Sequence, residues 1–428
     1  MKSGLSFLIA ALRCEIDELE QLARTSELVA TIGRLVHALQ RERGLSNVLL
    51  ASGGSRYAAE RRAQIAVCQA LETAVRDGFD QLENDAARIG NGARLFSRIA
   101  WVLPGLDALP DLRRRVDGLE MSAADATSAF VKLVAGLLAV VFEAADGATD
   151  PEISRLLVAL FNFMQGKEFA GQERACGAAA FASGHNDSAR QQQWLHLIES
   201  QERCFQVFVE FSSPDLGVQW LASQPAARMA ELERLRRVAC AAPAGVPLDP
   251  ELSPIWFDCC TSRIDAMQRI EEELAADLRA SCENKTTQAR AELNAHDALL
   301  AQLRSDARAE ASVFFDVIPP ENSARGKPAL NAGAPYGRQL ERSILEMVQE
   351  QSLRLQAMSD ELDTVRATLN ERKLVERAKG LLMAHRRLSE EEAHKMLRQT
   401  AMNQNRRVVE VAESVLSMAE YLPLGTPT

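Results

Sequence analysis

Residues 32–49 read IGRLVHALQRERGLSNVL, and they set the pattern for most of the chain. Their large apolar residues recur at steps of three and four: Ile32, Leu35, Val36, Leu39, Leu45, Val48 and Leu49. This is the period of one face of an α-helix, and it continues between short breaks such as Ser52-Gly53-Gly54 for about eight helices. Many long amphipathic helices with short connections predict bundles packed side by side, so the predicted fold class is all-α.

Composition supports this helical fold and limits the classes of function. Of the 428 residues, 47% are apolar, 25% are charged and only 5% are aromatic, whereas strands favour aromatic and β-branched residues. The net charge of −10 disfavours a protein whose whole surface binds nucleic acid, although it allows one local basic patch. The longest uninterrupted apolar run, Leu133–Phe142, has ten residues, about half of what a membrane-spanning helix needs, so we expect no membrane segment.

The sequence lacks the common catalytic and metal-binding motifs. It has no His-Glu-x-x-His, no Walker loop, no Gly-x-Ser-x-Gly and no Gly-x-Gly-x-x-Gly. The eight cysteines form no Cys-x-x-Cys pair, so free thiols in a reducing cytoplasm are the plain interpretation. We therefore predict a cytoplasmic protein that is not an enzyme and that binds no metal and no cofactor.

A change of composition divides the chain. Residues 317–337, VIPPENSARGKPALNAGAPYG, contain four prolines and three glycines, so they predict a linker between a helical domain at 1–316 and a C-terminal part at 338–428. The C-terminal part opens with a heptad seam that has one four-residue stutter: Leu340, Ile344, Met347, Gln351, Leu355, Met358, Leu362, Val365 and Leu369. Such a coiled-coil stripe must be buried, either in a homodimer or against the N-terminal domain.

Two short helices are predicted after this long one, which runs on through Leu382. Ser389-Glu390-Glu391-Glu392 is a capping box that begins the first of them, and Asn405 can cap the second. Both carry apolar residues at helical spacing. The C-terminal part is therefore expected to be a coiled-coil helix that ends in a small three-helix bundle.

The N-terminal domain contains an internal repeat. Residues 42–53 read ERGLSNVLLASG and residues 173–184 read ERACGAAAFASG, so Arg43 and Arg174 occupy equivalent positions. One interpretation is a duplicated helical hairpin whose Glu-Arg pair is a structural salt bridge. The other places both guanidiniums in one buried cleft, which would require an anion, because unpaired buried charge is costly and a guanidinium suits planar oxyanions. The pattern leaves both open.

Three segments carry a resemblance to a known family: LVHALQRERGLSNVLLASGG at 35–54, LFNFMQGKEFAGQERACGA at 160–178 and ELERLRRVAC at 231–240. They resemble the nitrate- and nitrite-sensing (NIT) domain. The resemblance implies paired helical bundles that hold nitrate or nitrite between arginines, and by motif position it implies Arg43, Arg174 and Arg236 as ligands. Arg41 is a lesser candidate. Ala175 replaces the glycine of the first copy, so the two halves of the site are expected to be inequivalent.

A second resemblance covers the C-terminal part. Residues 369–416 resemble the RNA-binding antitermination domain called ANTAR, with its hallmark at Ala378-Lys379-Gly380 and a following Met383. The segment 372–407 holds ten basic residues, four acidic residues and no Phe, Tyr or Trp. This basic patch suits phosphates, and base stacking is not expected. The candidate RNA-binding residues are Lys373, Arg377, Lys379, Arg398, Arg406 and Arg407.

NIT followed by ANTAR resembles the nitrate-responsive transcription antiterminators of bacteria. The resemblance implies a one-component switch in which nitrate or nitrite frees the ANTAR module to bind paired hairpins in leader RNA and so prevents termination upstream of nitrate-assimilation genes. The alternative is an anion-gated regulator whose coiled coil binds a protein partner and whose basic patch is incidental. His37, close to the Glu-Arg-Gly motif, is expected to be a core or surface histidine.

Overall fold

The structure is a computed structural model that describes residues 4–84, 92–146, 148–184, 187–242, 246–316, 353–354, 356–365, 390–404, 406–419 and scattered positions between 367 and 388. These residues form helices and no strands, so the predicted all-α fold class is confirmed. They divide into two compact units. The smaller unit is Met1–Arg24 with Arg279–Leu362, and the larger is Thr25–Leu278 with Asp363–Thr428. The predicted linker, 317–337, lies outside the described residues, and the predicted domain boundaries stay predictions.

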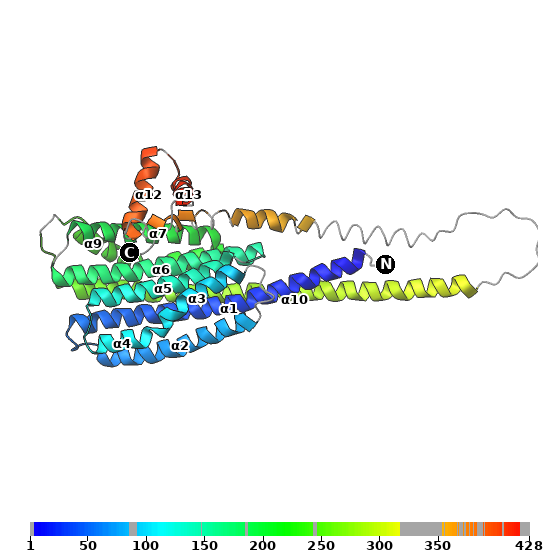
Figure 1. Cartoon of the computed structure of the whole chain (residues 1–428), viewed down its shortest axis with the longest axis horizontal. Coiled ribbons are helices and arrows are strands. Elements are labelled where there is room, and N and C mark those ends of the chain that lie inside the picture. The colour runs from blue at the N-terminus through cyan, green and yellow to red at the C-terminus, as the bar shows by residue number, and fades with distance from the viewer. Residues whose placement is uncertain are drawn as a thin grey trace, which may run out of the picture. The chain divides into compact units, whose positions relative to one another are not determined.

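The larger unit begins with a bundle that we call bundle 1. It consists of the later part of α1 (Gly4–Ala51), α2 (Ala58–Asn84), α3 (Gly92–Asp107), α4 (Leu109–Asp117) and α5 (Ala123–Asp146) (Figure 1). Of the apolar residues that set the helical period of α1, Ile32, Leu35, Val36, Leu39 and Leu49 are buried, and Leu45 and Val48 are half-buried. Pro104 lies inside α3, and Pro110 lies in the first turn of α4, where a missing backbone N–H costs nothing.

Bundle 2 follows in the same unit. It consists of α6 (Pro151–Ser183), α7 (Ser188–Phe211), α8 (Pro214–Ala222), α9 (Ala226–Cys240) and the first part of α10 (Leu252–Asp316) (Figure 1). The side chains of Asp150, Asp187 and Ser213 accept hydrogen bonds from first-turn N–H groups, which fixes where α6, α7 and α8 begin. Two clusters of aromatic rings, many in edge-to-face contact, fill its core.

Helix α5 is unusually apolar. An 18-residue window within Ala123–Ala145 has a mean hydropathy of 1.9, and by length and composition the stretch could cross a membrane. The uninterrupted apolar run within it is only Leu133–Phe142, which is why a count of consecutive apolar residues misses it. In the folded protein 61% of that window is buried, and α5 packs against α3 and α6. It is therefore a core helix of bundle 1.

The smaller unit brings together the start of α1, the end of α10 and the described part of the heptad helix. Arg354 binds Glu15 of α1 at 2.9 Å and Glu292 of α10 at 3.2 Å. Leu362 of the seam is buried. Arg354 therefore joins the described part of the heptad helix to α1 and α10 of its own chain, and whether the seam also pairs with a second copy stays a prediction. Residues 340–352 of the seam lie outside the described residues.

The C-terminal bundle belongs to the larger unit. α12 (Glu390–Gln404) and α13 (Val408–Ala419) confirm the two predicted short helices. Together with the helical residues around Ala378 they bury a small apolar core: Ala378, Leu382, Ala393, Leu397, Ala401, Val411 and Ala412. The predicted capping residues Ser389 and Asn405 lie outside the described residues.

Candidate anion-binding site

The two glutamates of the repeated Glu-Arg motif each bind an arginine of their own bundle. In bundle 1, Glu42 of α1 accepts two hydrogen bonds from Arg113 of α4, at 2.9 and 2.8 Å. In bundle 2, Glu173 of α6 accepts two from Arg236 of α9, both at 2.7 Å. All four side chains are buried. The duplication therefore repeats a carboxylate–guanidinium pair that ties a long helix to a shorter one.

The two arginines of the motif do not follow this pattern. Arg43 is 1% exposed and donates to Glu168 of α6, with Nη1 2.5 Å from Oε1 and Nη2 3.3 Å from Oε2. Glu168 also accepts a hydrogen bond of 2.8 Å from Gln40. The pair formed by Arg43 is thus a salt bridge between the two bundles, from α1 to α6.

Two glycines bring the motif arginines together. A Cβ added at Gly44 of α1 would lie 3.2 Å from Nη2 of Arg174, and a Cβ added at Gly171 of α6 would lie 2.7 Å from Nη2 of Arg43. Each guanidinium therefore lies on a glycine of the opposite helix. The glycine of the first Glu-Arg-Gly has a clear role, because any side chain there would displace Arg174. The two arginines consequently meet where α1 crosses α6.

Arg174 differs from Arg43 in having no acid. It is 7% exposed, donates to the hydroxyl of Thr261 at 3.0 Å, and lies over the ring of Phe257 at 5.0 Å. Among the described residues, no carboxylate oxygen lies within 4.0 Å of its guanidinium nitrogens. Burial and, next, the charge of Arg43 lower the pKa of Arg174 to about 10. The group is still a cation at neutral pH, and the charge of Arg43 disfavours its charged form.

His37 lies on the same side of α1 as Gly44, about two turns earlier. Its Nδ1 is buried and has no hydrogen-bond partner among the described residues. Burial lowers the pKa of His37 to about 3, helped by the charges of Lys167, Arg41 and Arg174. Lys167 is itself buried and paired with Glu271 of α10 at 2.6 Å. At the contact of α1, α6 and α10, several cationic side chains therefore surround a neutral imidazole.

Arg236, the third predicted ligand, is held by acids. Besides its two hydrogen bonds to Glu173 it donates to Glu233 at 2.7 Å, and these carboxylates raise its pKa above the ordinary value. Glu173 in turn accepts hydrogen bonds from Trp194 and Gln201 of α7, at 3.1 and 2.7 Å. The structure thus brings Arg43 and Arg174 together, whereas Arg236 forms an ion pair with Glu173, the residue that precedes Arg174 in the motif.

The basic residues predicted to bind RNA fall into two groups. Arg377, Arg398, Arg406 and Arg407 are exposed, whereas Lys379 is 6% exposed. Lys373 lies outside the described residues. Arg398 binds Glu199 of α7 at 2.9 Å, and the rings of His394 and His196 of α7 lie 5.3 Å apart. One side of α12 therefore faces α7 of bundle 2.

The sequence did not indicate four residues of the site. Glu168 and Gly171 lie in the quoted segment 160–178, and Gly171 is three residues before Arg174, so it lies on a neighbouring part of the same helix surface. Thr261 and Phe257 lie on α10, and nothing in their local sequence marks them. The acid partner of Arg43 could be found only from the crossing of two helices that are far apart in sequence.

The structure therefore consists of paired helical bundles with two buried, converging arginines, one of them without an acid, followed by a compact helical module, which is the architecture of a helical sensor protein with an attached C-terminal module. The sequence matches the family described as "Nitrate and nitrite sensing" (NIT) over residues 34–279, and the ANTAR domain family over residues 363–416. The chain belongs to the NIT family and carries an ANTAR domain. This is a family of regulators and not of enzymes.

Two relatives align over nearly the whole chain. The "Nitrate regulatory protein" of Klebsiella oxytoca is 36% identical over 412 residues, which cover 95% of this chain and 93% of that protein. The solved structure of the NasR transcription antiterminator is 34% identical, has a TM-score of 0.58, and is matched over 97% of this chain and 99% of that one. Both relatives are therefore aligned with most of the NIT and ANTAR regions of this chain.

Proposed function

We propose that the protein is a nitrate-responsive transcription antiterminator. Nitrate or nitrite binds at Arg43 and Arg174 and releases the ANTAR module, which then binds hairpins in leader RNA and prevents termination upstream of nitrate-assimilation genes. The observation that carries this proposal is the environment of Arg174. Its guanidinium is buried, has no acidic partner, and lies on Gly44, the residue that follows the second buried arginine, Arg43. That the anion is nitrate or nitrite is expected from the family and from the relatives.

The electrostatics of the pair favour a monovalent anion. Glu168 neutralises Arg43, so the two arginines together with this acid carry one excess positive charge. A buried charge without a counterion is costly, and a planar oxyanion can accept two parallel hydrogen bonds from a guanidinium. Nitrate and nitrite both match this charge and this planarity, so the pair does not distinguish them.

The resting arrangement of the ANTAR module is supported by its contact with α7. Arg398 is engaged by Glu199, Lys395 lies 3.5 Å from the side-chain oxygen of Gln192, and Lys379 is buried. Arg398 and Lys379 are among the residues expected to bind RNA, and the ion pair of Arg398 with Glu199 competes with an RNA phosphate for the same guanidinium. The contact therefore supports an unliganded state in which part of the RNA-binding surface is covered.

Helices α6 and α7 offer a route from the anion to the module. Glu173 immediately precedes Arg174 on α6, and its carboxylate accepts hydrogen bonds from Trp194 and Gln201 of α7. The opposite side of α7 presents Glu199 to the module. A shift of α6 on anion binding would therefore move the helix that engages α12, and coupling of this kind typically amounts to 1–3 kcal/mol. Arg236, which stays a predicted ligand, supports this route by fixing Glu173.

Two further expectations accompany the proposal. Its relatives are transcription regulators, so we place the protein in the cytoplasm. A homodimer through the coiled coil stays a prediction, and light scattering of the full chain with and without nitrate tests it. A doubling of the molar mass supports the homodimer, and a monomeric mass in both conditions contradicts it.

The experiment is a titration of the full chain with nitrate in a calorimeter, combined with filter binding of a leader-hairpin transcript. Wild-type protein is expected to bind nitrate and to gain RNA affinity with it. Arg174→Gln should weaken nitrate binding at least a hundredfold, about 2.7 kcal/mol, and keep the RNA affinity measured without nitrate. Arg155→Gln removes a charge elsewhere on α6 and is the matched control.

Two outcomes contradict the proposal in different ways. Unchanged nitrate affinity in Arg174→Gln contradicts the site. Tight nitrate binding that leaves RNA affinity unchanged in the wild-type protein contradicts the switch and favours an anion-gated regulator without RNA.

A further inference from the structure

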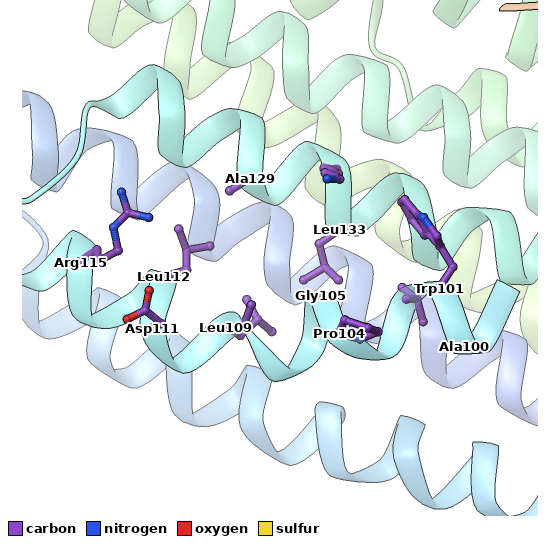
Figure 2. Close-up of a pocket in the computed structure, with 13 residues that line it drawn as sticks. Ala100, Trp101, Pro104, Gly105, Leu109, Asp111, Leu112, Arg115, Ala129 and Leu133 are labelled. Carbon is purple, nitrogen blue, oxygen red and sulfur yellow. The ribbon is translucent and has the colours of Figure 1, made fainter. Parts of the chain in front are cut away.

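Bundle 1 contains a groove that the anion site does not use. It has a volume of about 620 Å³ and runs between α5 on one side and α3 and α4 on the other (Figure 2). Its walls are mainly apolar and include Trp101, Pro104, Leu109, Leu112, Ala129 and Leu133. Sites for small organic molecules usually measure about 300–1,000 Å³ and have walls of this kind, whereas nitrate has no apolar surface to bury here.

The groove lies along the junction of α3 and α4. Pro104 lies inside α3, where it lacks the backbone N–H of the helical ladder, and a single residue, Ala108, separates α3 from α4. Trp101 lies on a glycine of α5, because a Cβ added at Gly136 would be 2.5 Å from the indole ring. The ring is thus seated on α5 while its side chain is 53% exposed. An indole exposed to this extent at the end of an apolar groove is available to a ligand.

Positive charge accompanies the apolar walls. Three consecutive arginines on α4 have different partners: Arg113 binds Glu42 and Glu72, and Arg114 binds Asp111 and Glu120. Arg115 lines the groove and has no acidic partner in the part of the chain that the structure describes. The same holds for Lys132 of α5, which also lines it. The acid of the groove, Asp111, is already neutralised by Arg114 at 2.7 Å.

We propose that this groove binds an organic anion with an apolar body, such as a carboxylate with an alkyl or aromatic tail, and that its occupancy is linked to the arginine pair through α4. The tail covers Trp101, Pro104 and Leu112, which are exposed or half-buried, above the buried floor of Leu109 and Leu133, and the acid group meets Arg115 and Lys132. The ligand is a second effector, chemically distinct from the small inorganic oxyanion proposed to bind at Arg43 and Arg174. The part of the proposal that concerns linkage rests on the proposed function.

The link is carried by the two sides of one short helix. α4 presents Leu109, Leu112 and Arg115 to the groove. It presents Arg113 to Glu42, the residue before Arg43. A ligand that shifts α4 must therefore either move the Arg113–Glu42 pair or break it. Because linkage is reciprocal, nitrate must then change the affinity of the groove by the same factor.

Decanoate, below the concentration at which it forms micelles, is the probe. It is titrated into the full chain, with tryptophan fluorescence and calorimetry as readouts; the other three tryptophans, Trp194, Trp220 and Trp256, are buried. We expect saturable binding and a fluorescence change that Trp101→Phe removes without removing the heat. The double variant Arg115→Ala with Lys132→Ala should bind at least tenfold more weakly, and Arg56→Ala with Arg62→Ala is the matched control.

Three results would overturn parts of the proposal. No saturable binding, or equal binding by the Arg115/Lys132 variant and its control, excludes the anion site. Equal binding of uncharged decanol by the wild-type protein excludes the role of the charge. Binding of decanoate that leaves nitrate affinity unchanged excludes the link, and absence of nitrate binding altogether is a failure of the proposed function and leaves the groove site standing.

Discussion

The two copies of the repeat share Glu-Arg and Ala-Ser-Gly at the same separation, but their arginines differ in electrostatic environment. Glu42 and Glu173 each hold an arginine of their own bundle, so the acids are used alike. The arginines are not: Arg43 has Glu168 as its counterion, and Arg174 has only a hydroxyl and an aromatic ring. A duplicated motif has therefore produced one ion pair between the bundles and one buried cation without an acid. In both copies the glutamate forms its ion pair with an arginine of a second helix and not with its neighbour in the motif, and the anion-binding cleft stays a prediction.

The largest expected effect concerns stability. Arg43→Met leaves the buried carboxylate of Glu168 without its counterion, so the free energy of unfolding should fall by about 3–5 kcal/mol. Arg174→Met removes a cation that has no acid, so it should be neutral or stabilising. Denaturant unfolding of both variants measures the difference.

A double variant serves as the control. Arg43→Met combined with Glu168→Leu removes the uncompensated charge and should recover much of the stability, since apolar replacements of buried ion pairs are often neutral. Equal destabilisation by Arg43→Met and Arg174→Met would show that the two copies are electrostatically equivalent.

The second prediction concerns the glycines at the crossing of α1 and α6. Gly171→Ala places a methyl group 2.7 Å from Nη2 of Arg43, and Gly44→Ala places one 3.2 Å from Nη2 of Arg174. Contacts this close displace the guanidiniums. We expect nitrate affinity to fall about tenfold in Gly171→Ala, or 1.4 kcal/mol, and less in Gly44→Ala. Calorimetric titration measures both.

Gly217→Ala is the control for the glycine series, because an added Cβ at Gly217 meets nothing within 4 Å. Wild-type nitrate affinity in Gly171→Ala would mean that the close contact does not hold the pair in place.

The comparison also shows what the sequence can and cannot determine. The helical period of Ile32, Leu35 and Val36 predicts α1, and the repeat predicts that Arg43 and Arg174 are equivalent in position. Which acid each arginine meets depends on the angle at which α1 crosses α6, and on residues such as Thr261 that come from a third helix. Glu42 lies next to Arg43 in sequence but on another face of the helix, so neighbouring positions in the sequence do not show which acid pairs with Arg43. Arg236 shows the same limit, because its carboxylate partners are visible only in the fold.

The third prediction uses pH. The pKa of His37 is lowered to about 3 in the folded protein and returns to about 6.5 on unfolding, so the unfolded state takes up a proton first as the pH falls. Stability that is present above pH 6.5 is therefore lost below it, by about 1 kcal/mol between pH 6.5 and 5.5. His37→Gln should lack this loss. Denaturant unfolding across this range, in the absence of nitrate, measures it.

The variant and the wild-type protein must be compared at each pH, because burial also lowers the pKa of His394, to about 4. Its contribution is common to both proteins and cancels in the difference. Identical pH slopes for the two proteins would mean that His37 is not held neutral beside Lys167, Arg41 and Arg174.

The smallest expected effect tests whether the contact of α7 with the ANTAR module restrains RNA binding. Glu199→Lys places a like charge opposite Arg398, and exposed ion pairs contribute about 0.2–1 kcal/mol. RNA affinity without nitrate should therefore rise about twofold, while affinity at saturating nitrate stays the same because the contact is then already broken. Glu202→Lys makes the same change of charge three residues later on α7, so a general electrostatic attraction of RNA would raise affinity equally in both variants, with and without nitrate. That result would remove the contact from the switch, and the route from Arg174 through Glu173 and α7 would then have no end point at the module.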